Sequence, residues 1–202
     1  MKRIERRFED VKDEIIEIHE IARRGVEICL KALSGDDESK IESVRIEQRA
    51  DVLDTEINYD CTHIIALFQP VARDLRTALS YIRISSAYER ITDLTNEIAM
   101  YDVDIPEEFY DMQRIILKMF DTIKKAYVGK EVDLKEDLIC EDDELDLFYT
   151  EFIEKVSDRR CHIREVVDII LIARHLERIG DLLLKIGKWL IFINEGKMMW
   201  LK

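Results

Sequence analysis

The sequence predicts an all-α fold made of two tandem, pseudo-repeated three-helix bundles, with six long antiparallel helices in all. The composition supports helices, because the chain of 202 residues is 47% apolar and 37% charged but holds only six glycines and two prolines. Residues 74–98 and 162–186 align without a gap at an offset of 88, and nine of the 25 pairs are identical, where chance gives about one or two. We therefore expect one repeat in residues 1–103 and the other in residues 104–202.

Short breaks in the apolar pattern mark the helix ends. Ser34–Asp37 closes the first helix with a glycine and opens the second with acidic side chains. Gln69-Pro70 closes the second helix, and Pro70 is expected at the first helical position of the third. The stretch 102–106 repeats that pattern, and Gly129-Lys130 and Ser157-Asp158 close the fourth and fifth helices. The expected helices are 4–33, 37–68, 71–102, 106–128, 131–156 and 160–194.

Both copies of the repeat carry the pattern Glu-Arg-Ile-x-Asp on their last helix. The Glu and Asp of each copy are four residues apart, hence on one helix face, and both continue the apolar stripe expected to face the interior. The second and fifth helices place a similar acidic pair in the same phase, so we expect four carboxylates to converge in each bundle. They are Glu47, Asp51, Glu89 and Asp93 in the first repeat and Asp142, Asp146, Glu177 and Asp181 in the second.

Such acidic clusters need an explanation, because each partly buried carboxylate costs several kcal/mol against a net folding stability of about 5–15 kcal/mol. Three explanations stay open: the carboxylates face water, they pair with arginines such as Arg90, Arg174 and Arg178, or they hold cations. For cations, an all-oxygen ligand set suits Mg²⁺, Mn²⁺, Ca²⁺ or iron better than a structural zinc site built from Cys and His.

Composition argues against several classes of protein. The net charge of −13 disfavours a nucleic-acid partner, since phosphate binding needs clustered Lys and Arg. The charged N-terminus lacks a signal-peptide pattern, and no apolar run approaches the ~20 residues of a transmembrane helix, so we expect a soluble, cytoplasmic protein. The four cysteines show no CxxC spacing and are expected to be reduced thiols rather than disulfides or zinc ligands.

No catalytic pattern is found, so we expect that the protein is not an enzyme. The sequence has no glycine-rich phosphate loop and no GxSxG. A di-iron enzyme of the ferritin type needs Glu-x-x-His, but Thr92 and Gly180 stand where the histidines would be. His19, His63 and His162 have no partner at ligand spacing and are expected at the surface or at the edge of the core.

Together these motifs resemble the PhoU family over essentially the whole chain. The most specific is IALFQPVARDLR at 65–76, which lies between the acidic pair at 47 and 51 and the motif Glu-Arg-Ile-Thr-Asp at 89–93. The resemblance implies two three-helix bundles whose acidic motifs hold iron or zinc clusters in some members, with the eight carboxylates above as ligands. It also implies a homodimeric, cytoplasmic negative regulator of phosphate uptake and phosphate homeostasis. Such a regulator acts on the ATPase subunit of the phosphate ABC transporter and on a sensor kinase, and meets the membrane only peripherally, through the transporter.

The two repeats differ in the charges around their acidic motifs. In the second repeat Arg174 lies on the stripe and Lys185 lies one turn beyond Asp181, whereas Ser86 and Glu97 hold the matching positions of the first. Either cation can neutralise the second cluster, so the first repeat is the expected metal site, with Mg²⁺ or Mn²⁺ open besides iron or zinc. Two other functions stay open: a carboxylate-bridged metalloenzyme on a helical bundle, and a PhoU-like regulator of a different ion transporter.

Overall fold

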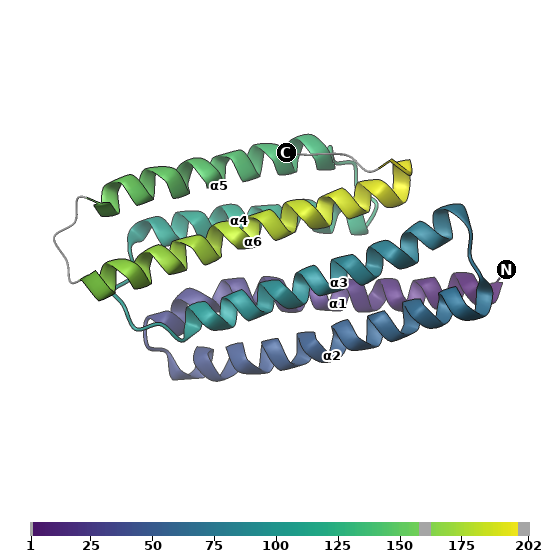
Figure 1. Cartoon of the computed structure of the whole chain (residues 1–202), viewed down its shortest axis with the longest axis horizontal. Coiled ribbons are helices and arrows are strands. Elements are labelled where there is room, and N and C mark those ends of the chain that lie inside the picture. The colour runs from purple at the N-terminus through teal and green to yellow at the C-terminus, as the bar shows by residue number, and fades with distance from the viewer. Residues whose placement is uncertain (1, 158–162, 198–202) are drawn as a thin grey trace.

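A computed structural model describes residues 2–157 and 163–197 of the chain. Within these ranges the protein forms six helices and no strand, which confirms the predicted all-α class (Figure 1). No helix end differs from its predicted position by more than three residues. The helices are α1 (Lys2–Leu33), α2 (Asp37–Phe68), α3 (Ala72–Ala99), α4 (Glu107–Tyr127), α5 (Leu134–Ser157) and α6 (Ile163–Glu195).

The helices form two antiparallel three-helix bundles that lie side by side in an elongated molecule (Figure 1). Helices α1, α2 and α3 pack on one another in the first bundle, and α4, α5 and α6 do so in the second. The bundles meet where α3 packs on α6 and α1 packs on α4, so their buried apolar side chains form one continuous core. The predicted boundary between 103 and 104 lies in the segment that joins α3 to α4.

Four of the helix ends illustrate how local chemistry sets the bounds. Asp36 is the N-cap of α2, where its carboxylate accepts a hydrogen bond of 3.2 Å from the backbone N–H of Ser39, as the acidic start of that helix predicted. Gly35 and Gly129 end their helices with φ of 93° and 69°, which favours glycine. Helix α3 ends at Ala99, three residues early, because its last backbone N–H groups bond three rather than four residues back and tighten the final turn.

The corner between α2 and α3 differs from its prediction. Pro70 does not open α3, which begins only at Ala72. The chain turns at Gln69 in the left-handed conformation (φ 46°), Pro70 is buried, and Ala72 adopts a second positive φ of 49°. An alanine in this region is strained by about 1–3 kcal/mol, so the surrounding packing holds the corner in place. It leaves Val71 exposed to solvent.

Two further predictions concern histidine and cysteine. His19 lies in the core with 0% exposure rather than at its edge, because its Nδ1 bonds to the hydroxyl of Tyr88 at 2.8 Å. Cys29, Cys61 and Cys140 are free thiols, as predicted. Asp158, Cys161 and His162 lie outside the described residues. None of the described helices has the length and apolar character needed to cross a membrane.

Candidate metal centre

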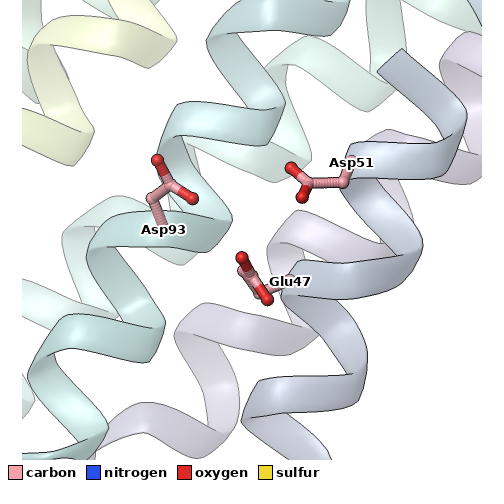
Figure 2. Close-up of side chains that lie close together, drawn as sticks. All are labelled: Glu47, Asp51 and Asp93. Atoms are coloured by element: carbon pink, nitrogen blue, oxygen red, sulfur yellow. The ribbon is translucent and has the colours of Figure 1, made fainter. Parts of the chain in front are cut away.

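Three of the predicted ligands meet between α2 and α3 of the first repeat (Figure 2). Glu47 and Asp51 project from successive turns of α2, and Asp93 faces them from α3. One carboxylate oxygen from each residue lies within 4.8 Å of the other two. Glu47 and Asp93 are partly buried, whereas Asp51 is exposed, so the predicted inward stripe of α2 reaches the surface at Asp51 before it turns inward again. We call these three residues the acidic cluster.

Polar contacts on either side of the acidic cluster hold α2 against α3. Ser43 donates a hydrogen bond of 3.1 Å to the side-chain oxygen of Asn96. Asp54 accepts hydrogen bonds from Ser85 at 2.6 Å and Ser86 at 3.1 Å. None of these contacts was predicted from the sequence. Serine and asparagine at inward positions beside an acidic residue are the signal that could have predicted them, because buried polar groups need partners.

The carboxylates of this region repel one another. Burial raises the pKa of Glu47, and the negative charges of Asp51 and Asp93 raise it further. The pKa of Glu89 is raised to about 7, first by burial and then by Asp93, Asp51 and Asp54. A cation bound at the acidic cluster would relieve this repulsion and favour the ionised forms.

Glu89 departs from the prediction that four carboxylates converge. It lies one turn before Asp93 on α3 and interacts with the acidic cluster electrostatically, but it is not one of the three residues whose oxygens meet. The first repeat also carries an internal counterion, in line with the open explanation that arginines such as Arg90 pair with these carboxylates, although the charges of the stripe predicted neutralisation mainly in the second repeat. Arg90 donates a hydrogen bond of 2.8 Å to Asp93 and lies 3.7 Å from Glu97.

The second repeat arranges its carboxylates differently. No second group of three possible ligands is found among residues 2–157 and 163–197. Glu177 accepts a hydrogen bond of 2.6 Å from Arg174, in line with the expectation that this arginine neutralises the site. Asp181 is paired with Arg178 at 3.3 Å, one of the arginine pairings left open by the sequence, and Lys185 forms no ion pair with the described residues. Burial and Asp181 raise the pKa of Glu177, and Arg174 opposes them.

A glycine explains part of this difference between the repeats. A Cβ atom at Gly180 would collide with Leu145, so the side chain of Leu145 packs directly on the backbone of α6. Asp142, one turn before Leu145, is then only 2% exposed. The matching position in the first repeat is Thr92, whose buried hydroxyl donates a hydrogen bond of 2.7 Å to the backbone oxygen of Glu89. The close helix contact therefore buries Asp142, whereas Glu47, its counterpart on α2, is only partly buried.

The acidic cluster fits a hard cation. Metal–oxygen bonds of about 2.0–2.6 Å place the ligand oxygens of one ion roughly 3–5 Å apart, and the three oxygens meet that limit without rearrangement of the helices. Carboxylates alone suit Mg²⁺, Mn²⁺ or iron, and they also bind zinc, though less selectively than Cys and His do. Glu47, Asp51 and Asp93 would hold the ion, and Glu89 interacts electrostatically with Asp51 and Asp93 from the neighbouring turn of α3.

The sequence comparisons match both repeats. A family model described as the PhoU domain matches residues 15–101 and again residues 109–190. A protein of Archaeoglobus fulgidus named "Phosphate-specific transport system accessory protein PhoU homolog" is 47% identical over 201 residues, which cover 100% of both chains. A protein of Thermotoga maritima named "Phosphate-specific transport system accessory protein PhoU homolog 1" is 31% identical, and the alignment covers 74% of this chain and 70% of the Thermotoga protein.

Solved structures share the fold. The phosphate transport system regulatory protein PhoU from Streptococcus pneumoniae superposes with a TM-score of 0.84 and 18% identity, over 98% of this chain and 99% of that one. PhoU from Pseudomonas aeruginosa gives a TM-score of 0.79 and 22% identity, over 96% and 99% of the two chains. At these identities the likeness concerns the arrangement of the six helices, which it reproduces along nearly the whole chain.

Proposed function

This chain belongs to the PhoU family, and from that premise we propose that it is a regulatory adaptor that restrains phosphate uptake when phosphate is plentiful. The observation that carries the proposal is the 47% identity, over the full length of both chains, to a protein named as an accessory protein of phosphate-specific transport. The adaptor would act in the cytoplasm as a homodimer. Its partners would be the ATPase subunit of a phosphate ABC transporter and a sensor kinase.

We further propose that the adaptor binds a cation at the acidic cluster. The convergence of Glu47, Asp51 and Asp93 supports this, as does the repulsion that raises the pKa of Glu47. Family resemblance favours iron or zinc, and the all-oxygen donor set is equally suited to Mg²⁺ or Mn²⁺. A cation there would tie α2 to α3 and stiffen the first bundle, and would not serve a reaction.

The test of the regulatory role is a deletion strain. Phosphate uptake is measured at high external phosphate in the wild type, in the deletion strain and in the deletion strain complemented with the intact gene. Binding of the purified protein to the transporter's ATPase subunit is measured at low and at high salt. The protein carries a net charge of −13, so we expect salt-sensitive docking. Normal repression in the deletion strain, with no binding at low salt, would contradict the proposal.

The same strains separate the alternatives. Unchanged phosphate uptake with altered uptake of another ion would indicate a different transporter as the target. A carboxylate-bridged metalloenzyme would show phosphatase or ferroxidase turnover that the triple variant Glu47→Ala, Asp51→Ala, Asp93→Ala abolishes. The proposed adaptor binds metal without turnover, and we expect the triple variant to lose the metal.

A further inference from the structure

One end of the molecule gathers arginines that form no ion pair with any of the described residues. Residues 2–157 and 163–197 contain 15 arginines, and seven of them form ion pairs, although the protein has 44 acidic residues. Five of the remaining eight lie at the N-terminal start of α1 and at the start of α3. The N-terminus lies beside the α2–α3 corner, at one tip of the bundle (Figure 1). These five residues, which we call the basic end, are Arg3, Arg6, Arg7, Arg73 and Arg76.

Two large apolar side chains project from the same tip. Leu67, on the last turn of α2, is 71% exposed, and Val71, the N-cap of α3, is 76% exposed. The corner that presents them has positive φ at Gln69 and Ala72, so the fold maintains it against backbone strain. Arg73 follows directly, and its guanidinium donates a hydrogen bond of 3.2 Å to the neutral side-chain oxygen of Asn194. Arg76 is partly buried, with its guanidinium 5.9 Å from the centre of the Phe192 ring, so the exposed cations of the tip are Arg3, Arg6, Arg7 and Arg73. The tip thus joins exposed apolar groups to cations outside the described ion pairs.

The opposite tip is acidic. The α1–α2 turn holds Asp36, Asp37 and Glu38, and the α3–α4 connection holds Asp102 and Asp104. Helix α1 runs between the two tips and has 32 residues, hence a length of about 48 Å. That distance is about six Debye lengths at physiological salt. The acidic tip therefore does not cancel the field of the basic end, despite the net charge of −13. The acidic residues among the arginines of the basic end, Glu5, Glu9, Asp10 and Asp74, reduce that field and leave the arginines in a small local excess.

We propose that the basic end binds an anionic phospholipid surface, with the long axis upright and with Leu67 and Val71 entering the headgroup layer. The shape favours a lipid surface over an acidic protein, because both apolar side chains stand exposed on a corner at the tip, which suits insertion into headgroups better than capture of a partner's helix. Basic residues around an apolar tip are the combination that binds peripheral proteins to anionic bilayers. A direct lipid contact would add to the contact through a transporter, and it does not depend on the proposed function.

The test is co-sedimentation of the full chain with vesicles of phosphatidylcholine alone or mixed with an equal amount of phosphatidylglycerol. We expect binding to the mixed vesicles at low salt, and loss of that binding at high salt. One cation near the surface contributes about fivefold in partitioning. The triple variant Arg3→Gln, Arg6→Gln, Arg7→Gln should therefore bind about a hundredfold more weakly. Leu67→Ser with Val71→Ser should weaken binding about tenfold, because membrane affinity scales with the apolar area that enters the headgroup layer. Both positions are exposed enough to leave the fold intact.

The matched control is Arg45→Gln with Arg83→Gln, which removes two arginines that also lack an ion pair among the described residues and lie away from the tip. We expect this variant to bind the mixed vesicles like the wild type. Three results would overturn the proposal: no binding of the wild type to mixed vesicles at low salt, equal loss in the control, or full binding by the triple variant. Loss of binding to the transporter's ATPase subunit in the triple variant, without vesicle binding by the wild type, would instead assign the basic end to a protein partner.

Discussion

Arg174 holds Glu177 in place with a hydrogen bond of 2.6 Å along one turn of α6. The positive charge of Arg174 therefore lies beside the acidic motif of the second repeat, on the same helix. Glu177 is therefore partly neutralised without a cation, although one of its carboxylate oxygens is buried and has no hydrogen-bond partner among the described residues. The first repeat has Ser86 at the matching position, and its three carboxylates converge instead.

The first prediction concerns metal content. Glu89→Ala with Asp93→Ala should lower the metal-to-protein ratio more than Glu177→Ala with Asp181→Ala, because only the first pair touches the acidic cluster. Elemental analysis of protein purified from metal-replete cells measures the ratio. The exposed pair Glu5→Ala with Glu9→Ala serves as the control and should change nothing. Equal losses from both test variants, or a wild type without metal, would contradict the prediction.

Removing the internal counterion should create cation affinity in the second repeat. With the first site disabled by Glu89→Ala and Asp93→Ala, Arg174→Gln should strengthen Mn²⁺ binding about tenfold, since one local positive charge is removed. Calorimetric titration measures the affinity. Arg114→Gln removes an arginine from a more exposed ion pair with Asp111 and should leave Mn²⁺ binding unchanged. An unchanged affinity after Arg174→Gln would show that Arg174 does not block the site.

Glu89 should make the metal-free protein less stable as the pH rises. Its folded pKa of about 7 exceeds the ordinary value of 4.5, so the folded state holds this proton more tightly than the unfolded state. The stabilisation is complete below about pH 4.5 and is lost as the pH rises through about 7. Glu89→Gln should therefore stabilise the metal-free protein at pH 8 by about 1 kcal/mol, allowing for solvent screening, with no gain at pH 4.5.

Urea unfolding in the presence of a chelator measures this effect. The exposed Glu144→Gln is the matched control and should not change the pH profile. Added Mn²⁺ should restore the stability that the metal-free wild type loses at pH 8, because a bound cation stabilises the ionised carboxylates. If Glu89→Gln changed the free energy of unfolding by the same amount at every pH, the electrostatic explanation would be ruled out.

His19 should make the protein less stable as the pH falls, whereas Glu89 makes it less stable as the pH rises. The folded pKa of His19 is lowered from 6.5 to about 4, mainly by burial and to a smaller degree by Lys124 and Arg23, while Glu20 opposes the shift. The unfolded state therefore takes up the proton first, and stability falls as the pH drops from about 6.5 to about 4. The expected loss is about 3 kcal/mol, from 1.36 kcal/mol per pKa unit.

His19→Gln should remove this acid sensitivity while lowering stability at every pH, since it disturbs the bond to Tyr88. The exposed His63→Gln is the control and should keep the acid sensitivity of the wild type. Urea unfolding between pH 4 and pH 8 measures both variants. An acid profile of His19→Gln that matches the wild type would assign the sensitivity to other groups.

The sequence by itself determined the six helices and their pairing into repeats. Helix periodicity and the spacing of breaks are local properties, and so is the phase of an acidic pair relative to the apolar stripe of its own helix. Glu47 and Asp93 could therefore be predicted as inward-facing carboxylates from periodicity alone, and both are partly buried in the fold. The local pattern also identified Arg174, together with Lys185, as a cation able to neutralise the acidic motif of the second repeat, and Arg174 contacts Glu177 in the fold.

Only the tertiary structure decided which carboxylates meet. The distance between two helices depends on the side chains packed between them, and a single glycine changes it: Gly180 lets Leu145 approach the backbone of α6 and leaves Asp142 buried. The same kind of packing leaves Glu89 outside the acidic cluster and encloses His19 in the core. The position of the α2–α3 corner beside the start of α1 also depends on how the helices are assembled (Figure 1). These positions depend on contacts between residues far apart in the chain, which no periodicity along one helix contains.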